Sequence, residues 1–261
     1  MALFVNLEAV DRAGKSTQLA AVASALRGRG LRVAVFAFPN RPSTSPLPHP
    51  SHRATGVLMD RYLREEVSFV HLSDTLFHRL GDCLDADFAA AYGDLPRPAL
   101  SERTKEVLRG LVEEKLYQVV NSVNRREHLE ELEAALADPG TDVVLAVRLQ
   151  SAWAYGVAKG VSPVQLRALE GDLPSPDLTV LLEVDPAVAR ARRGDDAPDR
   201  YEADGDYQAT VRARYRELAR EDADASRAEG RPPRYARVDA AEGPEAVCGA
   251  ITALVLARLG R

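Results

Sequence analysis

A short run near the start of the sequence carries the clearest chemistry. Residues 9–17 read AVDRAGKST, which matches the phosphate-binding pattern GxxxxGK[ST] except that Ala9 replaces the first glycine. In such a loop, backbone N–H groups point at phosphate oxygens and the lysine ammonium reaches the β- and γ-phosphates. We therefore expect Lys15 to hold the phosphates of ATP and Ser16 to place its hydroxyl on Mg²⁺. If position 9 requires a positive φ, Ala9 costs about 1 kcal/mol there.

The segments around this run predict the strand and helix that such a loop needs. Residues 3–7 (LFVNL) are apolar and rich in β-formers, residues 16–27 have an Ala/Leu pattern typical of a helix, and residues 31–38 (LRVAVFAF) predict a second strand. Strand, helix and strand in this order indicate a parallel βαβ unit. The proline-rich loop at 39–50 then follows the second strand on the ligand side of an open parallel sheet.

The remainder of the chain continues the same alternation. Strands are expected at 143–147, 178–184 and 235–238, and helices at 54–66, 113–137, 186–193, 207–228 and 244–259. This pattern predicts an α/β fold, a P-loop NTPase-like three-layer sandwich with a central parallel sheet of about five strands. We expect residues 1–261 to form a single domain, with an inserted helical segment at 67–112.

Composition excludes several classes of partner. A net charge of −5 and a pI near 5.6 argue against a surface that wraps a nucleic acid polymer. The apolar stretches at the N-terminus and at 251–259 are too short to span a membrane. Cys83 and Cys248 form no metal-spaced pair, and the five histidines show no metal-binding spacing. A cytoplasmic protein that binds neither membrane nor nucleic acid polymer is therefore expected.

Beyond the loop, several blocks resemble the thymidylate kinase family. The run LEAVDRAGKSTQ at 7–18 is similar to LEGVDRAGKSTQ, the eukaryotic-type loop of that family, and differs only at Ala9. Further similar blocks follow in family order: FPNR at 38–41, GVLM with YL at 56–63, NRRE at 124–127, SAWAYG at 151–156, LPSPDL at 173–178, and RYE with YQ at 200–208. Segment 67–112 has no counterpart in the family.

The resemblance implies phosphoryl transfer from ATP–Mg²⁺ to a nucleoside monophosphate, most directly dTMP to dTDP, by a cytoplasmic homodimer. It implies these catalytic residues: Asp11, Arg12 and Lys15. Arg12 would bridge the donor and acceptor phosphates as charge redistributes in the transition state. It implies that ATP is held by Ala13, Gly14, Lys15, Ser16, Thr17 and Arg190. The monophosphate would be bound by Arg41, Asn121, Arg125, Ser151, Tyr155, Tyr201 and Gln208.

Two of these arginines and one segment have specific roles by resemblance. Arg41 and Arg125 would grip the acceptor phosphate, because the planar guanidinium suits bidentate binding of phosphate. The charged segment 190–206 corresponds to a lid over ATP.

The sequence departs from the family pattern on the acceptor side. The Asp-Arg pair that ends a family strand falls on Ala146 and Val147, and a shift by one residue recovers only Arg148. The base-stacking Phe of the family falls on Asn121, which leaves Tyr117 or Trp153 as replacements. The literal Asp-Arg-Tyr at 60–62 falls within the helix expected at 54–66, and we interpret it as a coincidence.

These departures leave two alternatives open. The first is a kinase for a different or modified pyrimidine nucleotide, which Asn121 favours. The second is a relative that has lost turnover and serves as a nucleotide-binding or assembly protein, which Ala9 and the missing strand-end acid favour.

Overall fold

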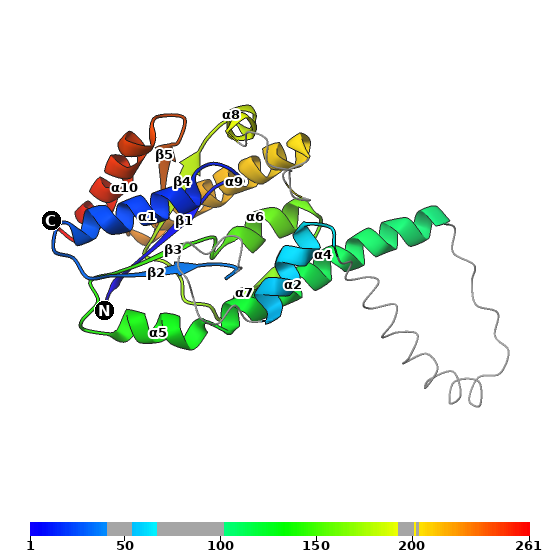
Figure 1. Ribbon diagram of the computed structural model, residues 1–261, viewed down its shortest axis with the longest axis horizontal. Coiled ribbons are helices and arrows are strands. Elements are labelled where there is room, and N and C mark those ends of the chain that lie inside the picture. Colours follow the sequence, from blue (N-terminus) through cyan, green and yellow to red (C-terminus); the bar gives the residue numbers. More distant parts are fainter. Residues whose placement is uncertain (41–53, 67–101, 193–200, 202–203) are drawn as a thin grey trace.

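Five strands form one parallel sheet at the centre of the molecule (Figure 1). The computed structural model describes residues 1–40, 54–66, 102–192, 201 and 204–261. Within these ranges the strand order is β2-β3-β1-β4-β5, and every neighbouring pair is parallel. The strands are β1 (Leu3–Glu8), β2 (Val33–Ala37), β3 (Val143–Val147), β4 (Leu178–Glu183) and β5 (Tyr235–Asp239). The predicted P-loop NTPase-like α/β fold is therefore confirmed.

Helices cover both faces of the sheet. They are α1 (Lys15–Arg27), α2 (Ala54–Leu63), α4 (Glu102–Arg126), α5 (Leu129–Ala137), α6 (Ser151–Ala158), α7 (Pro163–Glu170), α8 (Pro186–Ala191), α9 (Gly205–Glu229) and α10 (Pro244–Arg258). Helices α1 and α10 pack side by side, and α6 packs against both α4 and α9 (Figure 1). None of the helices in the described ranges combines the length and hydrophobicity needed to cross a membrane.

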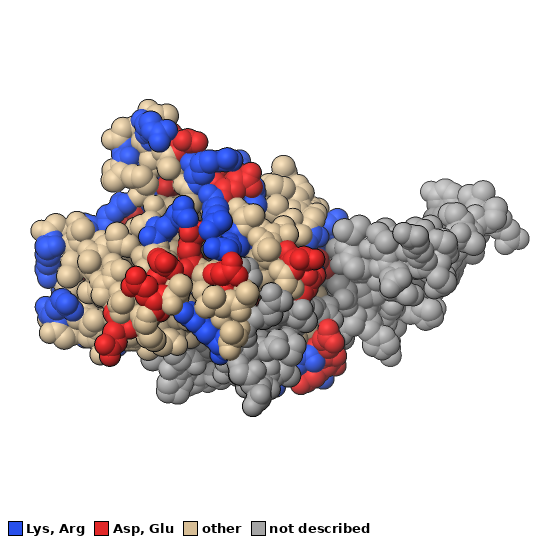
Figure 2. Space-filling view, turned by 90° about the horizontal axis from the view of Figure 1, so that it is seen from above, with Lys and Arg blue, Asp and Glu red and all other residues tan. Residues whose placement is uncertain are grey.

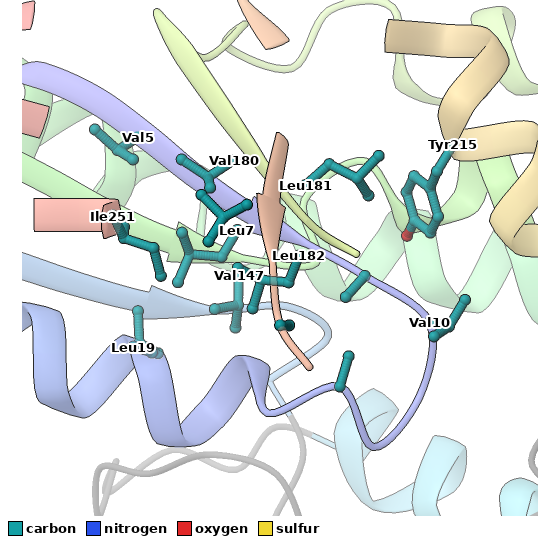
Figure 3. Close-up of a cluster of buried hydrophobic side chains, with 14 of the residues drawn as sticks. Val5, Leu7, Val10, Leu19, Val147, Val180, Leu181, Leu182, Tyr215 and Ile251 are labelled. Carbon is teal, nitrogen blue, oxygen red and sulfur yellow. The ribbon is translucent and has the colours of Figure 1, made fainter. Parts of the chain in front are cut away.

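The apolar core follows from the alternation of side chains along the strands. In β3, Leu145 faces a cluster that includes Leu19 of α1 and Ile251 of α10, whereas Ala146 faces a second cluster with Leu132 of α5. Figure 3 shows the first cluster between the sheet and the helices. A strand covered on both faces needs a continuous apolar run, and all five residues of β3 are buried. This continuous apolar run is why the sequence predicted β3.

The single helix expected at 113–137 is wrong, because the chain forms two helices there. Helix α4 ends at Arg126, α5 begins at Leu129, and His128 between them has φ −114° and ψ 9°. The His128 side chain is buried. Its Nε2 lies 3.1 Å from Asn40 Nδ2, and its Nδ1 lies 2.9 Å from Glu131 Oε2. These contacts hold the chain in a turn that brings Leu132 onto the second cluster.

Segment 67–112 is described only in its last part. Residues 102–112 form the first turns of α4, which is continuous to Arg126. Residues 67–101 lie outside the described ranges. The surface in Figure 2 carries positive and negative side chains interspersed over the described part of the face shown.

Candidate nucleotide-binding site

The candidate site lies at the carboxyl ends of β1 and β3, which are neighbours in the sheet. The chain leaves β1 toward β2 on one side, and leaves β3 toward β4 on the other. A sheet whose connections diverge in this way binds ligands at the point of divergence. Arg148 N donates to Leu7 O at 3.1 Å, which ties the turn after β3 to the end of β1.

The loop after β1 has the backbone shape of a phosphate cradle. Gly14 has φ +92° and Arg12 has φ +59°. Lys15 Nζ donates to Ala9 O and Val10 O, both at 2.7 Å, so the lysine side chain curls back over the loop. The first N–H groups of α1 have no acceptor within the helix and are available to an anion.

The substitution at position 9 leaves this shape intact. Among the described residues, the non-glycine positions with positive φ are Arg12, Glu65 and Arg148, so Ala9 is not strained. Its side chain is fully buried in the first core cluster. The penalty expected for a positive φ at this position is therefore not incurred.

The other predicted ATP-binding residues occupy the loop and the start of α1. Ala13 packs its side chain into the core, so only its backbone faces the ligand side, and Thr17 is exposed in the first turn of α1. Arg190 lies in α8. Of the predicted lid at 190–206, residues 193–200 and 202–203 lie outside the described ranges, as does Arg41.

Ser16, whose hydroxyl is predicted to bind magnesium, lies next to an arginine. Ser16 Oγ accepts a hydrogen bond from Arg148 Nη2 at 3.3 Å. At the end of β3, Ala146 and Val147 are fully buried and supply no carboxylate. Across the described ranges, no three His, Cys, Asp or Glu side chains are grouped to hold a metal. Because Mg²⁺ binds mainly to substrate phosphates and water in kinase sites, a single hydroxyl such as that of Ser16 is compatible with a magnesium ion carried on ATP.

Asp11 is linked to α9 by a pair of hydrogen bonds. Gln208 Oε1 accepts from Asp11 N at 3.3 Å, and Gln208 Nε2 donates to Asp11 Oδ2 at 3.1 Å. The same Nε2 donates to Tyr201 O at 2.9 Å. Asp11 Oδ1 also lies 3.8 Å from Lys15 Nζ. Three predicted residues that are distant in sequence, Asp11, Tyr201 and Gln208, therefore meet in space.

A small cavity of about 50 Å³ lies beside Lys15. This volume is below the range of about 300–1,000 Å³ typical of small-molecule sites, so a nucleotide enters only if the side chains of the wall move apart. Its lining residues are Asp11, Lys15, Pro39, Leu63, Tyr117, Gln118, Asn121, Arg148, Ser151, Ala152, Tyr155 and Tyr201. The structure thus gathers Asn121, Ser151, Tyr155 and Tyr201, all expected to bind the monophosphate, around the same space as Lys15.

Tyrosine rings build one wall of this cavity. Tyr117 stacks on Tyr62 with centroids 4.9 Å apart and meets Tyr201 edge-on at 5.6 Å. Tyr155 meets Tyr201 edge-on at 6.1 Å. Burial raises the pKa of Tyr155 and of Tyr201 well above the usual tyrosine value, so both hydroxyls stay protonated. Trp153 packs instead with Leu166 in a separate cluster, so Tyr117 is the aromatic residue beside Asn121.

Arg125 is placed away from the cavity lining. It is only 1% exposed, and its Nη1 donates to Glu170 Oε1 at 2.6 Å while its Nη2 donates to Arg148 O at 3.0 Å. Burial raises the pKa of Glu170, and the charge of Arg125 opposes that rise. The structure therefore shows Arg125 bound to the backbone of the turn after β3 and to Glu170 of α7.

Glu8 is a buried carboxylate whose role was not visible in the sequence. Its Oε1 accepts from Asn6 Nδ2 at 3.0 Å and Gln150 N at 2.7 Å, and its Oε2 accepts from Ser151 Oγ at 2.8 Å and Tyr215 OH at 2.7 Å. Ser151 therefore lines the cavity with its hydroxyl already committed to Glu8. The donors come from segments far apart in the chain, so only the fold reveals them.

Comparison with known proteins identifies the family. The family model described as thymidylate kinase matches residues 96–233, more than half of the chain. The thymidylate kinase of Jannaschia sp. (strain CCS1) is 32% identical over 179 residues, which cover 62% of this chain and 80% of that protein. The chain belongs to the thymidylate kinase family. The thymidylate kinase of Schizosaccharomyces pombe is 26% identical over 198 residues, covering 76% of this chain and 68% of that protein.

In this thymidylate kinase family member, sequence similarity and the geometry of the phosphate loop both indicate the site. The thymidylate kinase of Burkholderia mallei (strain NCTC 10229) is 40% identical over 126 residues, which cover 45% of this chain and 56% of that protein. The matched range 96–233 includes Tyr117, Asn121 and Tyr155 of the cavity but begins after the phosphate loop. Loop geometry and family membership are therefore independent lines of evidence for the same kind of site.

Proposed function

We propose that this chain transfers the γ-phosphoryl group of ATP to dTMP, giving dTDP and ADP. The observation that carries this proposal is that Lys15 belongs both to the phosphate cradle and to the wall of the cavity. A nucleoside triphosphate on the loop and a monophosphate in the cavity would therefore place their phosphates on either side of one ammonium group. Relatives named thymidylate kinase support dTMP as the acceptor.

The residues around the two phosphates supply charge and position. Lys15 and the first amides of α1 would bind the phosphates of ATP, and Arg12 would stabilise the charge that develops during transfer. Arg148, in the cavity lining and in contact with Ser16, adds a further positive charge beside the acceptor. Mg²⁺ carried on ATP and bound by Ser16 would neutralise phosphate charge. Catalysis by positioning and charge needs no covalent intermediate on the enzyme.

The hydrogen bonds around Asp11 keep the two halves of the site together. Gln208 binds both the backbone and the side chain of Asp11, and it also binds the backbone of Tyr201 in the cavity wall. Phosphoryl transfer depends on holding the reacting groups in line at close distance. We infer that Gln208 acts by fixing the loop relative to the acceptor cavity.

A coupled assay of ADP release tests the proposed function. The full chain would be assayed with ATP–Mg²⁺ and a panel of dTMP, dUMP, dCMP, dAMP and dGMP. We expect the highest kcat/KM with dTMP and loss of turnover in Lys15→Ala. Turnover only with another monophosphate would overturn dTMP as the acceptor, and ATP binding without turnover of any acceptor would overturn the kinase assignment.

We also propose that the protein works as a homodimer in the cytoplasm. Helices α2 and α4 pack against each other and expose three valines: Val57, Val119 and Val123. Exposed apolar side chains on adjacent helices favour contact with another protein surface. Light scattering coupled to gel filtration should give twice the mass of the chain, and Val123→Lys should shift it to the mass of one chain. A mass of one chain for the unmodified protein would overturn the dimer.

A further inference from the structure

Two buried amide side chains on one face of α4 form part of the cavity wall. Gln118 is 1% exposed and Asn121 is 4% exposed, and their spacing of three residues places them side by side along the helix. Within the described part of the chain, neither Gln118 Oε1 nor Asn121 Oδ1 has a hydrogen-bond partner. Buried polar groups are normally paired, so these two incompletely paired amides point to a ligand that enters the cavity.

A hydrogen bond with Glu114 determines which way the Gln118 amide is turned. Its Nε2 donates to Glu114 Oε1 at 2.7 Å, and Glu114 Oε2 accepts from Tyr201 OH at 2.8 Å. A carboxylate with a donor on each oxygen can only accept, so the amide nitrogen of Gln118 must face it. Gly156 of α6 leaves room for this amide, since a Cβ there would lie 3.3 Å from Gln118 Cδ. Oε1 is therefore presented as an acceptor.

The acceptor oxygen of Gln118 selects a ligand group that carries an N–H. A phosphate offers only acceptor oxygens at this position and cannot satisfy it, whereas the pairing edge of a nucleobase can. Thymine presents N3–H between two carbonyl groups. An amide beside Gln118 can complete the match, because it offers N–H to a carbonyl as well as accepting. Asn121 is that neighbouring amide.

We propose that Gln118 and Asn121 recognise the base of the acceptor nucleotide by hydrogen bonds. Gln118 Oε1 accepts from thymine N3–H, and the Asn121 amide turns by about 180° so that Nδ2, in place of the unpaired Oδ1, donates to the adjacent carbonyl. This inference rests on the proposed function. Asn121 takes the position where the resemblance places the family's stacking aromatic ring. Tyr117, the aromatic neighbour in the wall, has its ring stacked on Tyr62 at 4.9 Å. Specificity then comes from hydrogen bonds of α4 with the base edge.

A single-methyl change in the substrate tests the pair. N3-methyl-dTMP keeps the base, sugar and phosphate but cannot donate from N3. A site built to bind a donor strongly rejects an analogue without it, so we expect kcat/KM to fall by about 100-fold or more relative to dTMP. In Gln118→Met, kcat/KM for dTMP should fall by about 10- to 100-fold through KM, with the KM for ATP unchanged. The preference for dTMP over its methylated analogue should then shrink to about 3-fold or less.

Controls keep this test separate from folding and from the proposed function. Gln165→Met makes the same chemical change on the exposed face of α7 and should leave every kinetic constant unchanged. Calorimetric titration of dTMP and N3-methyl-dTMP into the full chain reports binding without turnover. Equal binding of both nucleotides would overturn the pair, as would a Gln118→Met variant that folds and still discriminates. Discrimination in binding without turnover would support the pair and overturn the kinase assignment instead.

Discussion

The phosphate loop and the acceptor cavity belong to one site but differ in how their binding groups are supplied. The loop uses backbone N–H groups and one lysine from the contiguous run 9–17, so its chemistry depends on local conformation. The cavity uses side chains from α4, from α6, from the turn after β3 and from Tyr201. Ala9 shows how tolerant the first arrangement is, because the loop takes alanine in place of the family's glycine without a positive φ at this residue. On the acceptor side, by contrast, each substitution changes a binding group.

The largest expected effect comes from removing the positive charge of Lys15, which should affect turnover more than binding of the acceptor. Lys15→Ala removes the ammonium from the phosphates but leaves the tyrosine wall and the amides of α4 in place. We expect kcat/KM to fall by about 10³-fold or more, while dTMP binding measured by calorimetry falls by only about 10-fold, because the rest of the cavity wall still contacts the nucleotide. If dTMP binding is lost as completely as turnover, the two regions are not separable.

The second prediction concerns the buried ion pair between Arg125 and Glu170, which lies outside the cavity lining. Arg125→Met leaves Glu170 buried without its partner, so the free energy of unfolding should fall by about 3–5 kcal/mol, measured by urea denaturation. The double variant Arg125→Met, Glu170→Met removes both charges and should recover most of this loss. It should also keep the KM for dTMP within a few-fold. A folded double variant whose KM for dTMP rises about 100-fold would instead assign Arg125 to the acceptor phosphate.

A glycine substitution tests the donor side through the backbone alone. Gly14 has φ +92° and open space where a Cβ would lie, so Gly14→Ala adds conformational strain without a clash. We expect about 1–2 kcal/mol of destabilisation and a several-fold rise in the KM for ATP. Gly230→Ala is the matched control, because Gly230 has φ +66° and equally open surroundings at the end of α9. It should cost similar stability with unchanged kinetics; an equal rise in KM would contradict a local role for Gly14.

The smallest expected effect is the pH dependence of the tyrosine wall. Burial raises the pKa of Tyr201 in the folded state, so the stability from its protonated form is complete below the unfolded pKa near 10 and is lost as pH rises above it. Each such tyrosine should contribute a slope of about 1.4 kcal/mol per pH unit above pH 10. Urea midpoints at pH 9 and 10.5 should therefore differ less in Tyr201→Phe than in the unmodified chain. If the urea midpoint changes equally with pH in both proteins, the Tyr201 hydroxyl is exposed to solvent.

The sequence was sufficient where a contact depends on neighbours along the chain. The phosphate loop, β3 and the parallel direction of the strands follow from short apolar runs and one motif. The acceptor side required contacts between distant segments, such as Tyr201 with Glu114, or Asp11 with Gln208. Asn121 was expected at the substrate from its position in the family pattern, but its neighbour Gln118 was not. Arg125 matched a motif although its partner, Glu170, belongs to a helix that the sequence did not reveal.

The carboxylate of Glu8 has a consequence for mutational work on this enzyme family member. It is the last residue of the strand that leads into the phosphate loop, and it also receives hydrogen bonds from Ser151 and Tyr215. Residues that share one buried partner do not contribute independently, so effects of substitutions around it will not simply add. A change at Ser151 can therefore register as weaker use of ATP, and double-mutant cycles are needed to apportion a kinetic defect to either nucleotide.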